Sequence, residues 1–265
     1  MVDAETLVLL HGFAGTSRAW DGVLAHLPAE RYRPLPLDLP GHGSQAAGAG
    51  GVGIQETGVE GAGVKEAGVE KTGLGEIHLD QAVASVLRRS APSFALCGYS
   101  LGGRIALHVA LAAPERVSSL TLIASGPGIE DAGERAERRA ADRALADEIE
   151  LGSIERFAER WCAQPVFAGD PPEVEALARA DYLRNDPPSL AASLRGLGQG
   201  ELPSLWGRLG ELAMPVTVVA GERDAKYQTI ANRMAAMIPR ARVEIVDGGH
   251  RLPLESPAQV AAAIS

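Results

Sequence analysis

The sequence predicts an α/β protein in which a mainly parallel sheet carries helices on both faces and an inserted group of helices forms a cap. Short apolar runs alternate with segments of helical spacing along most of the 265 residues, as is typical of strands joined by crossover helices. The stretch 127–210 breaks this alternation because its patterns are helical only. Apolar residues make up 46% of the chain, which is enough for a sizeable core.

Six short apolar runs are predicted to form the strands. They span residues 6–10, 33–39, 93–97, 120–124, 215–220 and 243–246. The second run contains Pro34 and Pro36, which have no N–H group to donate to a neighbouring strand. We therefore expect an imperfect strand there.

Helical spacing predicts the elements between and after these strands. Residues 77–89, 101–113 and 258–264 are predicted to cover the sheet, and the second of these helices should stop at Pro114. Residues 131–149, 154–161, 172–184 and 190–197 are predicted as cap helices. We thus expect a core of 1–126 and 211–265 with a cap of 127–210, which would enclose a pocket at the carboxyl edge of the sheet.

Residues 45–75 form a glycine-rich stretch with a five-residue repeat. Gly53, Gly58, Gly63, Gly68 and Gly73 recur at this period, and each unit offers one small apolar side chain. That is too little apolar surface to offset the entropy of ordering the chain. The composition predicts a flexible surface loop, with a lid or a partner-binding segment as the alternative.

Charge and cysteine content limit the functional class. The net charge is −9 and the isoelectric point is about 5.2, which argues against binding to nucleic acid or an anionic membrane. The two cysteines provide neither a disulfide framework nor metal-ligand spacing. With no signal peptide or membrane span apparent, we expect a cytoplasmic protein. A monomer and a small homo-oligomer both remain open.

The segment Gly98-Tyr99-Ser100-Leu101-Gly102 matches the G-x-S-x-G pattern. It lies between a predicted strand and a predicted helix, which is the context that a nucleophile elbow requires. A β-carbon at either glycine would crowd the neighbouring backbone in such a tight turn. The alternative is a glycine-rich turn with an incidental serine.

Two further loops supply partners for Ser100. Asp224 follows the strand at 215–220, and His250 follows the strand at 243–246. Imidazole can hold the serine proton near neutral pH, and a carboxylate fixes the imidazole tautomer. Backbone N–H groups of Phe13 and Leu101 are predicted to form an oxyanion hole. Each residue could instead belong to an ordinary surface turn, but all three elements occur in the order Ser, Asp, His.

With these motifs, the chain resembles the α/β-hydrolase superfamily. Within it, the chain resembles the 2-succinyl-6-hydroxy-2,4-cyclohexadiene-1-carboxylate (SHCHC) synthases of menaquinone biosynthesis. The resemblance rests on 98–104, on 161–167 and on Gly221-Glu222-Arg223-Asp224-Ala225-Lys226-Tyr227. It extends over nearly the whole chain except residues 45–75, where the family has a short connection.

Arg104 lies one helical turn after Ser100, so the two side chains share a face. A guanidinium at the mouth of a pocket needs an anion, either a protein carboxylate or a carboxylate of the substrate. The resemblance places Arg138 and Arg184 at carboxylate-binding positions and Trp161 and Phe167 on the apolar wall. Tyr99 is included among the predicted substrate-binding residues.

The resemblance implies a lyase that eliminates pyruvate from a small polycarboxylate, with Ser100 as the base and with no metal or organic cofactor. A carboxylesterase or a carbon–carbon bond hydrolase that forms an acyl-enzyme is the first alternative. A catalytically silent binding protein is the second.

Overall fold

The computed structural model describes residues 4–46 and 77–265. Within these ranges, six strands form one sheet in the order β2-β1-β3-β4-β5-β6, and every neighbouring pair is parallel. The strands are β1 (Glu5–Leu10), β2 (Tyr32–Leu37), β3 (Phe94–Tyr99), β4 (Val117–Ile123), β5 (Val216–Gly221) and β6 (Ala241–Val246). The predicted parallel sheet is confirmed.

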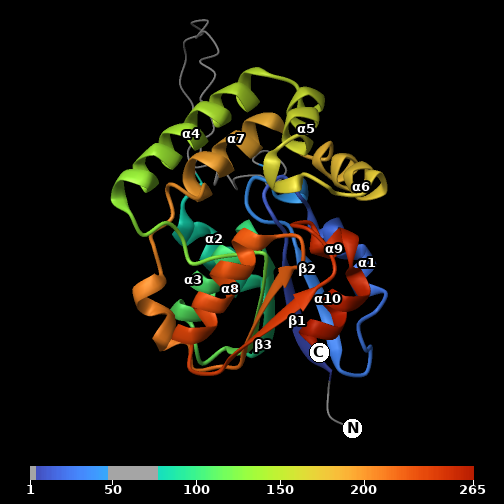
Figure 1. Cartoon of the computed structure of the whole chain (residues 1–265), viewed down its shortest axis with the longest axis vertical. Helices are drawn as coiled ribbons and strands as arrows, with labels where there is room; N and C mark the ends of the chain where they lie inside the picture. The colour runs from blue at the N-terminus through green and yellow to red at the C-terminus, as the bar shows by residue number, and fades with distance from the viewer. Residues whose placement is uncertain (1–3, 47–76) are drawn as a thin grey trace, which may run out of the picture.

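Helices cover both faces of this sheet (Figure 1). One face packs against α2 (Leu79–Arg89), α3 (Leu101–Ala112) and α8 (Ala225–Met237) in a large apolar cluster. The other face packs against α1 (Asp21–Leu24), α9 (Leu252–Glu255) and α10 (Pro257–Ile264). The strands β1 and β3 are therefore nearly continuous runs of buried residues, without the alternation of apolar and polar side chains that a half-exposed strand shows.

The strand with two prolines forms at the edge of the sheet. Pro34 and Pro36 lie in β2, which pairs only with β1 in the described sheet, so their missing N–H groups remove no bond from a second neighbour there. The helix α8 was not among the predicted elements. Its buried residues Tyr227, Ala231 and Met234 have the spacing of one helical face, and this was the signal that could have found it.

Four α-helices and the short 3₁₀ helix η3 (Pro165–Phe167) follow β4 on the carboxyl side of the sheet (Figure 1). The four α-helices are α4 (Ala132–Leu151), α5 (Ile154–Cys162), α6 (Pro172–Tyr182) and α7 (Pro187–Leu197). These four helices are called the cap below. The next helical segment, the 3₁₀ helix η4 (Trp206–Glu211), packs through Trp206 and Leu209 into the core cluster instead. The four cap helices match the predicted spans 131–149, 154–161, 172–184 and 190–197 to within three residues, whereas η4 lies inside the predicted cap segment 127–210 but packs with the core.

The glycine-rich stretch predicted as a flexible loop falls almost entirely outside the described residues. Among the helices that the structure describes, none has the length and apolar character of a membrane-spanning segment.

Candidate active site

Ser100 occupies a strained turn between β3 and α3. Its backbone has φ 52° and ψ −111°, a conformation that costs a non-glycine residue of order 1–3 kcal/mol. A β-carbon at Gly98 would lie 2.4 Å from the carbonyl oxygen of Gly102, and one at Gly102 would lie 2.2 Å from that of Leu10. The glycines therefore permit the elbow, as the sequence predicted, and the turn raises Ser100 at the end of the central strand.

The three predicted loops meet at Ser100. His250 Nε2 lies 3.3 Å from Ser100 Oγ, and His250 Nδ1 lies 2.8 Å from Asp224 Oδ2. Asp224 also caps α8 by accepting the N–H of Tyr227 through Oδ1. Asp224 and His250 are both buried, so this network holds the imidazole in one orientation, with Nδ1 toward the carboxylate and Nε2 toward the serine.

Two backbone N–H groups beside the serine are available as donors. In the described part of the chain, neither Phe13 N nor Leu101 N donates a hydrogen bond, and both residues line cavities that include Ser100. His11 supports the Phe13 loop because its Nδ1–H donates to Gly12 O and its Nε2 accepts the N–H of Leu39. Burial lowers the pKa of His11, which keeps the ring neutral and able to accept that bond.

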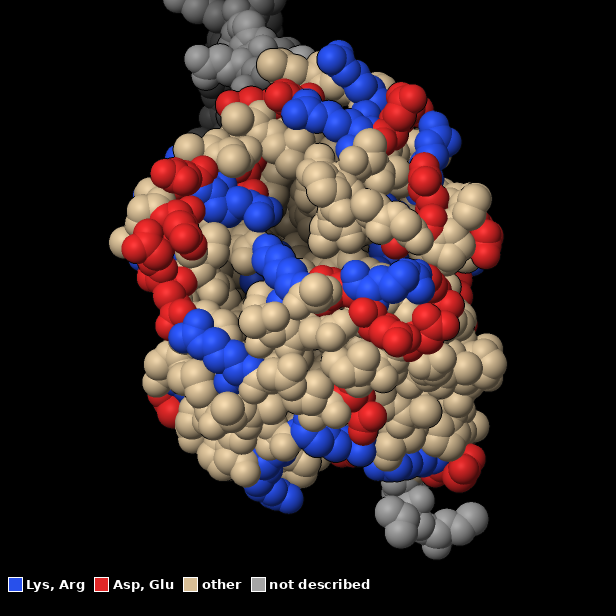
Figure 2. Space-filling model, in the orientation of Figure 1, with Lys and Arg blue, Asp and Glu red and all other residues tan. Residues whose placement is uncertain are grey.

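Two chambers meet over Ser100, and both are bounded by Phe13, Trp161 and Phe167. The chamber on the α3 side, called the basic chamber below, has a volume of about 140 Å³. Its lining includes Arg104, Arg138, Gln199, Lys226, Tyr227 and His250. Figure 2 shows a hollow between cap and core with basic side chains beside it, although the molecule as a whole is acidic.

The second chamber, called the inner chamber below, has a volume of about 40 Å³. It is lined mainly by apolar groups, together with Tyr99, Asp181, Tyr182 and Arg251. Tyr99, which was predicted to bind substrate, lines this chamber. Trp161 and Phe167 form walls that the two chambers share, with ring centroids 6.2 Å apart.

Arg104 is buried in the basic chamber, where Asp142 acts on its charge from a distance without forming a salt bridge. No carboxylate of the described residues pairs with it, and its Nε has no hydrogen-bond partner among them. Burial lowers the pKa of Arg104, and Tyr227 opposes this effect. Arg138, also on the basic chamber, donates to Asp142 Oδ1 at 2.7 Å and to Gln199 Oε1 at 3.1 Å. Arg104 is therefore available to an external anion.

Arg184, which was predicted at a carboxylate-binding position, lines neither of the two chambers over Ser100. Its side chain is 49% exposed, and Nε lies 3.8 Å from Asp181 Oδ1. It lines an outer hollow with Arg18 and Leu177, because α6 ends at Tyr182 and the chain has already turned away from the chambers. The structure brings Tyr182 and Arg251 to the inner chamber instead.

Arg251 was not predicted as a site residue, although it directly follows the predicted His250. Only 1% of this residue is exposed, and its guanidinium carbon lies 3.6 Å from the centre of the Phe167 ring. Lys226 and Tyr227, which line the basic chamber, were not predicted as lining residues either. The signal that could have found these two is their place in the family motif that begins before Asp224.

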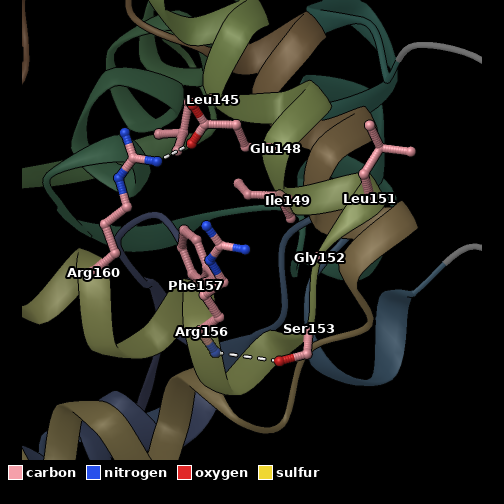
Figure 3. A pocket seen from close by; sticks show the side chains of 9 residues that line it. All are labelled: Leu145, Glu148, Ile149, Leu151, Gly152, Ser153, Arg156, Phe157 and Arg160. Carbon is pink, nitrogen blue, oxygen red and sulfur yellow. Dashed lines mark hydrogen bonds and ion pairs between the residues drawn. The ribbon is translucent and has the colours of Figure 1, made fainter.

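A separate hollow of about 350 Å³ lies between α4 and α5 (Figure 3). Phe157 lines it and also contacts Phe13 and Trp161, with ring centroids 6.1 and 5.7 Å away. Arg160 is paired with Glu148 at its rim. Because Ser100, Asp224 and His250 do not contribute to its lining, this hollow is not the reaction site.

Comparisons with known proteins agree with this geometry. Residues 7–263 match the alpha/beta hydrolase family. A Bacillus subtilis (strain 168) protein, provisionally named SHCHC synthase, is 35% identical over 96% of this chain and 86% of its own length. SHCHC synthase of Enterobacter sp. (strain 638) is 33% identical over 98% of this chain and 90% of its own.

Among solved structures, MenH from S. aureus superimposes with a TM-score of 0.81 at 29% identity, covering 98% of this chain and 91% of that one. The shared fold, the serine elbow and the full-length similarity lead to one conclusion. The chain belongs to the alpha/beta hydrolase family and, within it, to the group of relatives named SHCHC synthase.

Proposed function

We propose that this protein is a lyase that eliminates pyruvate from 2-succinyl-5-enolpyruvyl-6-hydroxy-3-cyclohexene-1-carboxylate to give SHCHC. The observation that carries the proposal is Arg104, a buried guanidinium one turn from the hydrogen-bonded Ser100 that pairs with no carboxylate of the described residues. A substrate with several carboxylates supplies the anion that this residue lacks. The relatives named SHCHC synthase support the same reaction.

The site residues suit a proton abstraction. Ser100, in contact with His250, removes the ring proton next to the succinyl carbonyl, and the proton passes to the imidazole. The electron pair of the broken C–H bond moves to the carbonyl oxygen, where the N–H groups of Phe13 and Leu101 stabilise the enolate. The electrons then return through the ring and break the bond to the enolpyruvyl oxygen. The enolate of pyruvate that departs takes up the proton held by the His250 imidazolium, which gives pyruvate and returns the imidazole to its neutral form.

The decisive experiment measures pyruvate release with coupled lactate dehydrogenase, using the enolpyruvyl precursor generated in situ. We expect release well above the spontaneous rate, and Ser100→Ala should reduce it to the spontaneous level while the variant still binds product. A p-nitrophenyl ester serves as the control substrate. Rapid ester cleavage without pyruvate release would instead identify an esterase or a carbon–carbon bond hydrolase, and inactivity on both would favour a binding protein.

A further inference from the structure

Arg251 is held rigidly at the inner chamber by three different groups. Its Nη1 donates to Asp170 Oδ2 at 2.6 Å, and its Nε donates to the hydroxyl of Tyr182 at 3.2 Å. The guanidinium also stacks over Phe167, which is a wall of both chambers. These contacts fix the plane of the guanidinium before any ligand arrives.

The third nitrogen of this guanidinium, Nη2, is unsatisfied. It is buried and makes no hydrogen bond within the described residues. An unsatisfied buried donor costs about 1–3 kcal/mol, so such groups call for an explanation. Burial raises the pKa of the Cys162 thiol, and both the charge of Arg251 and a side-chain hydrogen bond with it oppose that rise. A thiol is only a weak hydrogen-bond acceptor, so it cannot replace an anion at this guanidinium.

Two carboxylates near Arg251 are already engaged: Asp181, which lines this chamber, and Asp170, which is not part of its lining. Asp170 is bonded to Arg251, and Asp181 accepts the backbone N–H of Thr16 at 2.8 Å and its hydroxyl at 2.5 Å. The remaining lining is largely apolar and includes Phe13, Trp161, Ala178 and Leu254. An occupant would therefore need an apolar stem and one strong acceptor at its end.

We infer that Arg251 binds the terminal carboxylate of the substrate's succinyl arm, with Nη2 as the donor. This inference rests on the proposed function. The arm has two methylene groups and a carboxylate, which match the apolar walls and the unsatisfied donor. The ring requires more room than the arm, and the basic chamber is the larger of the two, at about 140 Å³ against about 40 Å³. The substrate thus spans both chambers, with its carbonyl over Ser100.

The test compares two ligands on matched variants. Binding of SHCHC and of its methyl ester at the succinyl carboxylate is measured by calorimetry with wild type, Arg251→Lys and Arg104→Met. In wild type, the ester should bind at least tenfold more weakly than SHCHC. Arg251→Lys keeps a positive charge for Asp170 but loses the two Nη groups of the guanidinium. The ratio of the dissociation constants of the ester and SHCHC should therefore fall below about threefold. Arg104→Met should weaken both ligands and keep the tenfold difference.

The outcomes separate this inference from the proposed function. If wild type releases pyruvate but Arg251→Lys keeps the full tenfold difference, the arm is not bound by Arg251 and only this inference fails. If wild type releases no pyruvate, the proposed function fails first. Should Arg251→Lys not fold, Tyr182→Phe takes its place, because it frees Nε and loosens the guanidinium. The ratio of the dissociation constants of the ester and SHCHC should then fall at least threefold, and an unchanged ratio would overturn the inference.

Discussion

At the scale of single residues, Arg104 carries a buried charge that forms no salt bridge within the described residues. Arg104→Ala should raise KM and lower kcat together, because the guanidinium both binds a carboxylate and orients the reacting carbon. A hydrogen bond to a charged group contributes about 1.5–3 kcal/mol, so kcat/KM should fall about 10- to 100-fold. Steady-state pyruvate release measures this. Arg139→Ala is the matched control, since Arg139 is exposed on the same cap helix as Arg138 and lines neither chamber. Unchanged kinetics for Arg104→Ala would assign the residue to structure.

Asp38 illustrates a residue whose ionisation supports the loops around the site. Its carboxylate accepts hydrogen bonds from Ser17 N, Ser44 N and Ser44 Oγ. Burial raises the pKa of Asp38, but these bonds outweigh it and lower the pKa from 3.8 to about 2. A lowered pKa stabilises the fold above the unfolded-state value, and this contribution is lost as the pH falls from about 4 through about 2.

Urea unfolding of Asp38→Asn should therefore show a loss of about 1 kcal/mol at pH 7, after allowance for solvent screening. The difference from wild type should shrink as the pH approaches 2. A difference that stays constant from pH 7 to pH 2 would show that the ionised carboxylate contributes nothing and that only its shape matters.

At the scale of elements, the elbow depends on close contact between α3 and β1. Gly102→Ala places a β-carbon 2.2 Å from Leu10 O, and a backbone atom cannot move aside as a flexible side chain can. We expect a loss of about 3 kcal/mol or more in thermal or urea unfolding. Gly207→Ala is the control, because a β-carbon at this position in η4 would have no neighbour within 4 Å among the described residues. It should change stability by less than about 0.5 kcal/mol. Equal effects of the two substitutions would contradict this account.

Elements with a regular pattern of apolar residues could be predicted from the sequence. Features whose position depends on where neighbouring segments end or turn could not. All six strands were found because each is an apolar run of strand length, and Ser100, Asp224 and His250 were found because each follows such a run. The helix α8 was missed because its buried residues are only Tyr227, Ala231 and Met234, which makes the helical pattern of the segment weak. The positions of Arg184 and Arg251 could not be derived from spacing, since they depend on where α6 ends and how the chain turns after His250.

At the scale of the whole molecule, the site exists only where cap and core meet. The buried apolar residues of the cap helices form one cluster, which also includes Ala14 from the loop after β1 of the core. Phe13 from the same loop packs against this cluster. The helix α6 packs against the 3₁₀ helix η1 (Ser17–Trp20) and against α9, both of which belong to the core. Arg251 of the core is bonded to Tyr182 of the cap. Cap and core are therefore expected to unfold together.

A ligand that spans both chambers should stabilise this joint unit as one. At a product concentration of 100 times Kd, the free energy of unfolding should rise by about 2.7 kcal/mol, which corresponds to a Tm increase of about 5–10 °C for a chain of this size. Scanning calorimetry should show a single transition that shifts as a whole. Phe13, Trp161 and Phe167 line both chambers, so a bound ligand contacts cap and core alike. A separate transition of the cap at lower temperature, with a Tm that does not change when product is added, would therefore contradict this prediction.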